Sequence, residues 1–278
     1  MVVRIPLPGL TITLAVLAAV VIVLTVGLKI VPAPFAALAF ASGEVKTVPL
    51  PAGLPAPVER YYRRLYGGQI PVITSVIMTG RAKVRPFGWP TLNARFRFTH
   101  VAGRSYRHYI EATFFGLPIM RINESYIDGT SRFETPMGTE EGEPKSGQAA
   151  NLGMWAELSG LPAALLADPR VHWEAVDAET ALLVVPAHGT GTERFVVRFD
   201  PDTGLVTLME VMRYQTKDSP RKTLWVTETL AWTRLEGQML SGTGSAWWYG
   251  ARRPWAVFTT EHVVLNADLA SYLPRRGQ

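Results

Sequence analysis

Two hydrophobic patterns divide the chain. From Leu10 to Leu28, nineteen residues carry no charge, and a helix of this length rises roughly 28 Å, enough to cross a bilayer core. From Ile70 onward, apolar and polar residues alternate in short runs, which is the pattern of β-strands. The two patterns predict an N-terminal membrane helix followed by a β-rich domain.

The β-rich part reads as a meander of antiparallel strands. Turn-forming pairs such as Asp128-Gly129 and Glu236-Gly237 separate the runs,. The polar, acidic stretch from Thr135 to Gly147 predicts a loop. The predicted strands are residues 72–84, 92–101, 105–114, 117–127, 171–176, 181–186, 193–199, 205–213, 222–235, 238–245 and 256–265.

One helical segment, from Ser146 to Asp168, stands among these strands. Its larger apolar residues recur at helical spacing and form one stripe that needs a surface to cover. Ser159-Gly160 and Pro162 predict a break, because a proline inside a continuous helix costs about 3 kcal/mol. The residues of the stripe are Met154, Trp155, Leu158, Leu161 and Leu165.

These elements predict an α+β, mainly β, fold: a transmembrane helix, then a large curved antiparallel sheet, or half-barrel, packed with a few helices. Expected divisions are an N-terminal tail and anchor (1–31), a Pro/Gly-rich linker (32–56), a β-rich soluble domain (57–270) and a basic C-terminal tail (271–278). The short N-terminal tail favours a single-pass cell-membrane protein whose soluble domain is extracytoplasmic. A cleaved signal peptide is the alternative, with Ala39-Phe40-Ala41 resembling a cleavage site.

Composition narrows the chemistry. A net charge of +5 over 278 residues is no signature of nucleic-acid binding. The absence of cysteine excludes disulfides, thiolate metal ligands and a cysteine nucleophile. No catalytic motif stands out, so neither a cofactor nor a metal is expected, and enzymatic activity is unsupported rather than excluded.

The titratable residues leave alternatives open. His100 and His108 could meet across a hairpin, although separate core or surface histidines are more common. Glu157 lies on the apolar helical segment, where burial would raise its pKa. The commoner outcome for such a residue is partial exposure or pairing with an arginine. Glu124 and Glu157 are the candidate bases if the protein is a hydrolase.

Two clusters suggest contacts with lipid. The segment from Trp247 to Trp255 holds three tryptophans, a tyrosine and two arginines, which suits a ligand entrance, a lipid interface or an aromatic plug. A short helix predicted at residues 57–66 has a basic face. That face either contacts anionic lipid or is simply solvated, and its residues are Arg60, Arg63 and Arg64.

Several motifs, in order and spacing, resemble an uncharacterised prokaryotic family of membrane-associated, β-rich proteins. Ser159 departs from that family, where an aromatic residue is common. The resemblance implies an architecture similar to lipoprotein carriers such as LolA and LolB, at the level of the fold alone. The motifs are Leu54-Pro55-Ala56-Pro57-Val58, Ser125-Tyr126-Ile127-Asp128-Gly129, Pro162-Ala163-Ala164-Leu165-Leu166 after Glu157, Trp173-Glu174-Ala175-Val176-Asp177, Phe199-Asp200, Arg213-Tyr214 and Trp247-Trp248.

The leading hypothesis is non-catalytic binding of a lipid or another hydrophobic ligand near the membrane. Glu157 and Arg213 are expected to meet the polar end of the ligand, and the aromatic turn to form the mouth of the site. The alternatives are an accessory subunit of a membrane protein complex and, ranked third, a hydrolase with a carboxylate base. Candidate ligand-binding residues are Glu157, Arg213, Tyr126, Trp155, Trp248 and Trp255.

Overall fold

The structure, a computed structural model, describes residues 7–36, 38 and 40–275. Four helices and fifteen strands are defined in this part of the chain. In chain order they are α1 (Leu7–Lys29), β1 (Thr47–Pro49), α2 (Ala56–Tyr66), β2 (Gln69–Pro71), β3 (Ser75–Val84), β4 (Leu92–Val101), β5 (Ser105–Phe114), β6 (Leu117–Ile127), β7 (Thr130–Thr135), β8 (Gly138–Glu141), α3 (Pro144–Leu158), α4 (Ala163–Ala167), β9 (His172–Ala175), β10 (Thr180–Pro186), β11 (Thr192–Phe199), β12 (Val206–Arg213), β13 (Thr223–Leu235), β14 (Gln238–Trp248) and β15 (Ala256–Leu265).

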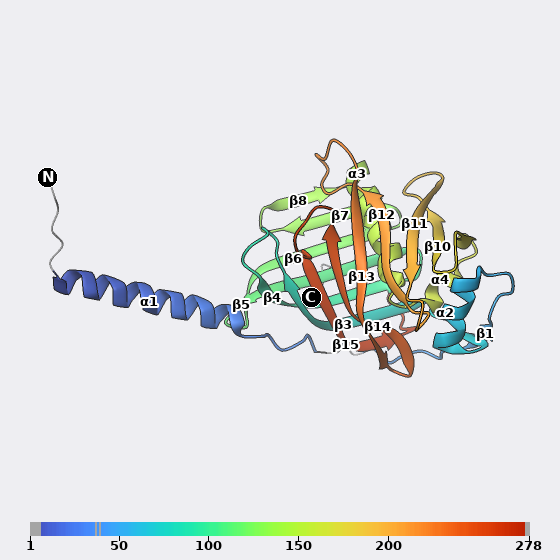
Figure 1. Ribbon diagram of the computed structural model, residues 1–278, viewed down its shortest axis with the longest axis horizontal. Coiled ribbons are helices and arrows are strands. Elements are labelled where there is room, and N and C mark those ends of the chain that lie inside the picture. Colours follow the sequence, from blue (N-terminus) through green and yellow to red (C-terminus); the bar gives the residue numbers. More distant parts are fainter. Residues whose placement is uncertain (1–6, 37, 39, 276–278) are drawn as a thin grey trace.

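Thirteen of the strands form one antiparallel sheet in the order β8-β7-β6-β5-β4-β3-β15-β14-β13-β12-β11-β10-β9. The sheet bends over on itself, so that the β3–β8 half crosses behind the β11–β14 half (Figure 1). α3 lies inside the bend and packs against β6 and β7 on one side and β12 on the other. In the part of the chain described, β8 and β9 are edges with one neighbour each, so the sheet is curved rather than closed. The predicted fold class is confirmed.

Alternation along the strands sorts side chains onto two faces. On β4, Phe96 and Phe98 point into the bend and belong to the main hydrophobic core. Their neighbours Arg95 and Arg97 point to the outer face, where they contact residues of the N-terminal segment. This two-residue period explains why the predicted ends of β4 match those of the structure.

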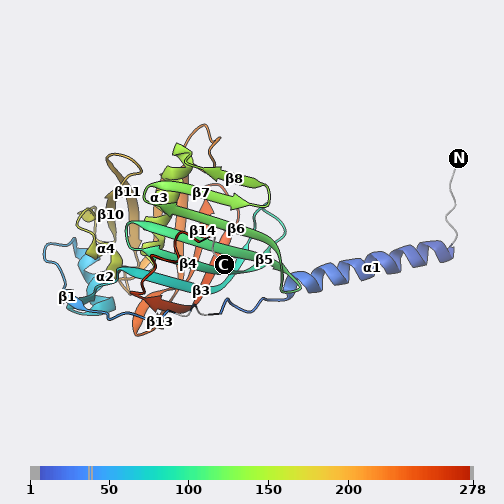
Figure 2. The ribbon, with the colours of Figure 1, turned by 180° about the vertical axis from the view of Figure 1, so that it is seen from behind.

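The stretch between α1 and β1 and the stretch after β15 both pack on the outer face of β3–β5, and the latter crosses these strands in Figure 2. Phe35 lies beneath two guanidinium groups, 4.4 Å from Arg95 and 5.1 Å from Arg97, an arrangement that cation–π attraction stabilises. Near the C-terminus, Leu269 and Leu273 are buried against Ile77 in a second small core. Residues expected to be linker and tail therefore pack on the sheet.

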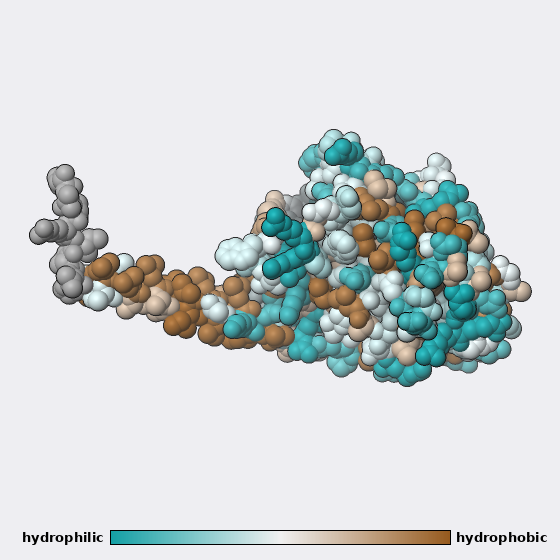
Figure 3. Space-filling view, viewed as in Figure 1, coloured by the Kyte–Doolittle hydropathy of each residue, from teal (hydrophilic) through white to brown (hydrophobic). Residues whose placement is uncertain are grey.

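α1 ends beside the turn that joins β5 to β6. The Phe115 amide donates a 2.9 Å hydrogen bond to the carbonyl of Gly27. A Cβ atom at Gly27 would lie 2.4 Å from the Phe114 ring, which would have to move. α2 lies at the opposite end of the domain (Figure 1). α1 is apolar along its length, in contrast to the largely hydrophilic surface of the domain (Figure 3).

The ladder between β14 and β15 is short. It pairs only four residues, from Thr243↔Thr259 to Ala246↔Ala256. The flanking ladders pair nine residues between β15 and β3 and ten between β13 and β14. This seam is the weakest point at the centre of the sheet.

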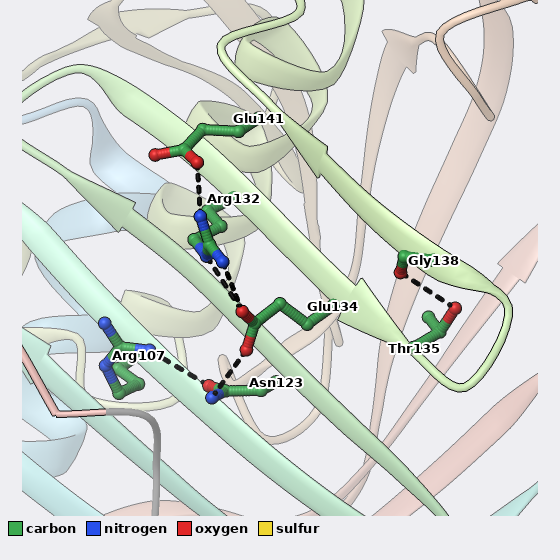
Figure 4. Close-up of polar contacts among 7 residues, drawn as sticks. All are labelled: Arg107, Asn123, Arg132, Glu134, Thr135, Gly138 and Glu141. Atoms are coloured by element: carbon green, nitrogen blue, oxygen red, sulfur yellow. Dashed lines mark hydrogen bonds and ion pairs between the residues drawn. The ribbon is translucent and has the colours of Figure 1, made fainter.

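The loop predicted from Thr135 to Gly147 is wrong. The segment contains β8 and the first turn of α3, and polar contacts fix it to the neighbouring strands (Figure 4). Arg132 pairs with Glu134 and Glu141, and Glu134 accepts a 3.3 Å hydrogen bond from Asn123. Charged partners, rather than apolar alternation, form this edge of the sheet. The predicted break after Leu158 is confirmed, since α4 begins at Ala163.

Candidate functional site

A cavity of about 180 Å³ lies between α3 and the concave face of the sheet. Its walls come from both halves of the sheet: β3 to β6 on one side, and β12 to β15 on the other. Residues at the end of α3, including Ala156 and Ser159, complete it. The bend in the sheet therefore creates the space, and α3 roofs it.

Aromatic rings form one wall. The Phe96 and Phe98 rings have centroids 4.6 Å apart, and Phe258 on β15 packs against both at 5.3 and 5.1 Å. Trp255 extends this wall to the surface, where it is 36% exposed, with its ring 6.2 Å from Phe258. Aromatic pairs at these separations are mutually attractive, so the wall is rigid and apolar.

Arg213, at the end of β12, supplies a positive charge to the opposite wall. Its guanidinium lies 4.2 Å from the Trp225 ring centroid and 5.5 Å from that of Trp248. The side chain is half-buried, and its Nε is inaccessible to solvent and lacks a hydrogen-bond partner. Burial lowers the pKa of Arg213, opposed by the negative charges of Glu124 and Glu157. No carboxylate of the described residues lies within ion-pair distance of this guanidinium.

Next to the cavity, two histidines converge on the carboxylate of Glu157. The pairing of β4 with β5 places His100 opposite Tyr106 and Phe98 opposite His108, so the two histidines are diagonal neighbours with ring centroids 5.3 Å apart. Their Nε2 atoms lie 3.0 Å (His100) and 2.6 Å (His108) from Oε2 of Glu157. The sheet register and the last turn of α3 together build this cluster.

The two histidines reverse the effect of burial on the pKa of Glu157. Burial alone raises the pKa of this carboxyl, but the charge and close contacts of His108 and His100 outweigh it and lower the pKa to about 2,. Burial lowers the pKa of His100, although Glu157 opposes this. Burial thus acts on Glu157 in the expected direction, but its partners are two histidines rather than the arginine that was the alternative, and they reverse the net shift of its pKa.

Glu124 on β6 lies behind His108. It faces His108 across the β5–β6 ladder, with its Oε2 4.0 Å from Nδ1 of His108. The hydroxyl of Tyr106 donates a 2.5 Å hydrogen bond to Oε1 of Glu124. Burial, followed by the charge of Glu124 and this bond, raises the pKa of Tyr106, so the tyrosine stays a neutral donor.

The cluster has the donor set of a metal centre. The ligand atoms of His100, His108 and Glu157 all lie within 4.8 Å of one another. Two imidazole nitrogens and a carboxylate oxygen are a combination that binds zinc and other late first-row metals. No local sequence motif predicts this cluster, since its three residues come from three elements, β4, β5 and α3.

The candidate residues fall into two groups. Glu157, Arg213 and Trp255 line the cavity, and Trp248 lies behind Arg213. The other two point elsewhere, Trp155 into the core against Gly103, and Tyr126 toward Nδ1 of His188 at 3.1 Å. Further cavity residues that no sequence pattern marked as functional are Tyr106, Phe96, Phe98, Phe258 and Met78.

The basic face of α2 lies away from the cavity. Arg60 donates to the carbonyl of Ala178, and Arg63 pairs with Glu59 one turn earlier on the helix. Arg64 is exposed. None of the three lies beside α1, because the two helices occupy opposite ends of the domain (Figure 1).

By its fold and cavity, this chain is a protein with a bent antiparallel sheet, an internal helix, and a pocket between the sheet and the helix. Residues 44–260 match the sequence profile of a family of unknown function, DUF6544. The chain belongs to this family. A search of curated proteins found no match.

Three solved structures are similar to this chain at low sequence identity. A putative outer membrane lipoprotein-sorting protein domain from Vibrio parahaemolyticus is 11% identical, with a TM-score of 0.41 over 75% of this chain and 90% of that chain. A DUF1329 family protein from Desulfovibrio piger is 12% identical, with a TM-score of 0.41 over 72% and 90%. A LolA superfamily protein from Nitrosomonas europaea is 10% identical, with a TM-score of 0.42 over 77% and 94%. At this distance the matches carry no information on function.

Proposed function

We propose that this protein binds an acyl lipid, or another apolar molecule with an oxygen-bearing head, beside a membrane and without transforming it. The observation that carries the proposal is Arg213, which faces the cavity with no ion-pair partner among the described residues. A guanidinium has only hydrogen-bond donors, so its partner must be an acceptor. A carboxylate or ester oxygen at the end of an apolar chain fits beside Trp225 and opposite the aromatic wall.

The size of the cavity limits what it holds. An engineered cavity of about 150 Å³ binds benzene, whereas sites for drug-sized ligands span about 300–1,000 Å³. At about 180 Å³, this cavity accommodates the head and first carbons of one chain. The rest of a long lipid extends past Trp255, or the cavity expands.

The proposed location beside a membrane rests on α1. Residues Gly9–Lys29 are long and apolar enough to cross a bilayer, a test that a signal sequence also passes. In our proposal α1 is an uncleaved anchor and the domain lies on the extracytoplasmic side. The β5–β6 turn beside α1 then lies at the membrane surface, with three apolar side chains exposed there: Phe115, Leu117 and Ile119.

This placement competes with membrane contact through α2. Arg60, Arg63 and Arg64 reach the same bilayer only if the domain lies on its side. The exposed apolar turn next to the anchor favours the upright arrangement.

The proposal is tested by titrating the purified full-length chain, in mild detergent, with a fluorescent fatty acid and with its methyl ester. We expect Arg213→Gln to weaken binding by about tenfold or more, since a hydrogen bond to a charged group contributes about 1.5–3 kcal/mol. Arg198→Gln is the matched control, because Arg198 is exposed and paired with Glu210 on β12. The ester arm separates an anionic head from a neutral one.

Equal affinity of wild type and Arg213→Gln would refute the assignment of the head group. If the wild-type chain binds neither probe and instead retains a stoichiometric protein after mild extraction, the accessory-subunit alternative replaces this proposal.

A further inference from the structure

We infer that His100, His108 and Glu157 form a binding site for a divalent cation of the zinc class. The cluster borders the cavity of the proposed lipid site, but the two proposals rest on different side chains, because the lipid proposal rests on Arg213. Two observations point to a metal. The ligands are two imidazoles and a carboxylate, and their ligand atoms lie within 4.8 Å of one another.

The donor atoms are buried deeply enough to need partners. The His100 side chain is fully buried and that of His108 is 5% exposed. Nε2 of both histidines and Oε2 of Glu157 are inaccessible to solvent. Buried polar atoms are almost always partnered, and leaving one unpaired costs about 1–3 kcal/mol.

Short distances do not make these contacts good hydrogen bonds. Although Nε2 of His108 and Nε2 of His100 lie 2.6 and 3.0 Å from Oε2 of Glu157, neither contact has hydrogen-bond geometry, and bonds weaken steeply when misaligned. The Tyr106–Glu124 bond nearby is well formed. The three atoms thus lie at ion-pair distances but with poor hydrogen-bond geometry, and they converge as ligands around a shared ion do.

The donor types select the cation. Calcium and magnesium prefer shells made of oxygen, whereas imidazole suits zinc, copper, cobalt and nickel. Two histidines and a glutamate are a known ligand set for zinc, at bond lengths of about 2.0–2.2 Å. Tetrahedral ligands at such lengths lie roughly 3.3 Å apart. The 2.6 Å contact between His108 and Glu157 would therefore lengthen, and all three ligand atoms already lie within 4.8 Å of one another.

The surroundings also fit. Glu124 lies behind His108, 4.0 Å from its Nδ1, in the place where a carboxylate commonly orients a metal-bound histidine. Nδ1 of His100 has no such acceptor among the described residues, so the orienting carboxylate serves His108 alone. Because His108 and Glu157 line the cavity, the fourth coordination position opens toward it, leaving room for water or a ligand oxygen.

The test measures metal content without lipid. The full-length chain, purified with an affinity tag that contains no histidine, is stripped with chelator, incubated with Zn²⁺ or with Mg²⁺, and analysed by elemental mass spectrometry. We expect about one zinc per chain and no magnesium. His108→Gln and Glu157→Gln should each lose the zinc, whereas His172→Gln should keep it, because His172 forms an exposed pair with Glu174.

A second readout guards against variants that fold poorly. Co²⁺ added to the wild-type chain should give the intense visible absorption of a tetrahedral site, and zinc should raise its unfolding temperature. Failure of the wild type to bind zinc or Co²⁺, which would leave the cluster holding only a proton, overturns the inference. So does equal zinc binding by folded His108→Gln. Because no lipid is present, failure here is distinct from failure of the proposed function.

Discussion

The guanidinium of Arg213 lies 4.2 Å from the ring centroid of Trp225, so an aromatic face holds the cation where an acidic side chain would usually be its partner. Cation–π attraction in a desolvated setting contributes about 2 kcal/mol. It positions the charge without neutralising it. The cation therefore stays available to a ligand.

Replacing Trp225 should release Arg213. We expect Trp225→Leu to weaken fatty-acid binding by roughly tenfold, and to have little further effect in an Arg213→Gln background, because the two residues act as a unit. Fluorescence titrations of the two single variants and the double variant check this. The control is Tyr249→Leu, because Tyr249 is exposed in the turn after β14. Additive losses would show that Trp225 acts by packing alone.

The mouth of the cavity gives a kinetic prediction. Trp255→Ala removes a ring that is partly exposed and packs against Phe258. The ligand should dissociate about tenfold faster, since a buried aromatic contact contributes about 1.5–3 kcal/mol. Stopped-flow displacement of the bound probe measures the rate. An unchanged rate would move the mouth away from the aromatic turn.

Glu124 should tune the metal site without binding the ion. Glu124→Gln keeps the size of the side chain but removes the charge behind His108. Zinc affinity should fall roughly tenfold, the effect usual for the second layer of a metal site. Competition with a chromogenic chelator gives the affinity. Glu174→Gln, beside the exposed His172, should bind zinc as the wild type does.

Acid stability should depend on Glu111, on the outer face of β5. Burial raises the pKa of this carboxyl, but the hydrogen bond from Tyr109 and the bonds and charge of Arg95 lower it below 4.5 overall. Because the folded pKa is depressed, the carboxylate stabilises the fold above pH 4.5 and loses this effect as the pH falls through the folded pKa.

Glu111→Gln should therefore be less stable than wild type at pH 7, by about 2 kcal/mol, with the deficit shrinking below pH 4.5. Urea unfolding at several pH values measures it. A deficit that stays constant with pH would mean that the charge of Glu111 does not contribute.

The chain contains no cysteine, so one introduced thiol is unique. A spin label on Leu117→Cys, beside the end of α1, should be accessible to oxygen dissolved in the bilayer. A label on Arg64→Cys, at the far end of the domain, should report an aqueous environment. The reverse pattern would favour membrane contact through α2.

Strands were predicted correctly where one physical signal, the alternation of apolar and polar residues, dominates. β4 was predicted with its observed ends because Phe96 and Phe98 alternate with charged residues, and the ends of the predicted β5 also match. β7 and β8 were missed because ion pairs such as Arg132–Glu141 hold them, and charged pairs leave no hydrophobic period.

The cavity was predicted only in part. Glu157 and Arg213 were expected at one ligand end, and both line it. The approach of His100 and His108 across a hairpin was one of the alternatives left open, and the β4–β5 register brings them together. Glu157 was not expected to join them, because 49 positions along the chain separate it from His108. Such proximity arises from tertiary packing and leaves no local motif.

The short ladder between β14 and β15 bears on the size of ligand that the cavity can admit. Phe258 and Thr260 line the cavity from one side of this seam, and Gly244 and Ala246 from the other. Separating the two halves here breaks fewer hydrogen bonds than at the ladders on either side. We therefore expect the two halves of the sheet to separate first between β14 and β15, where the fewest ladder hydrogen bonds break. A ligand too long for the cavity would enter there.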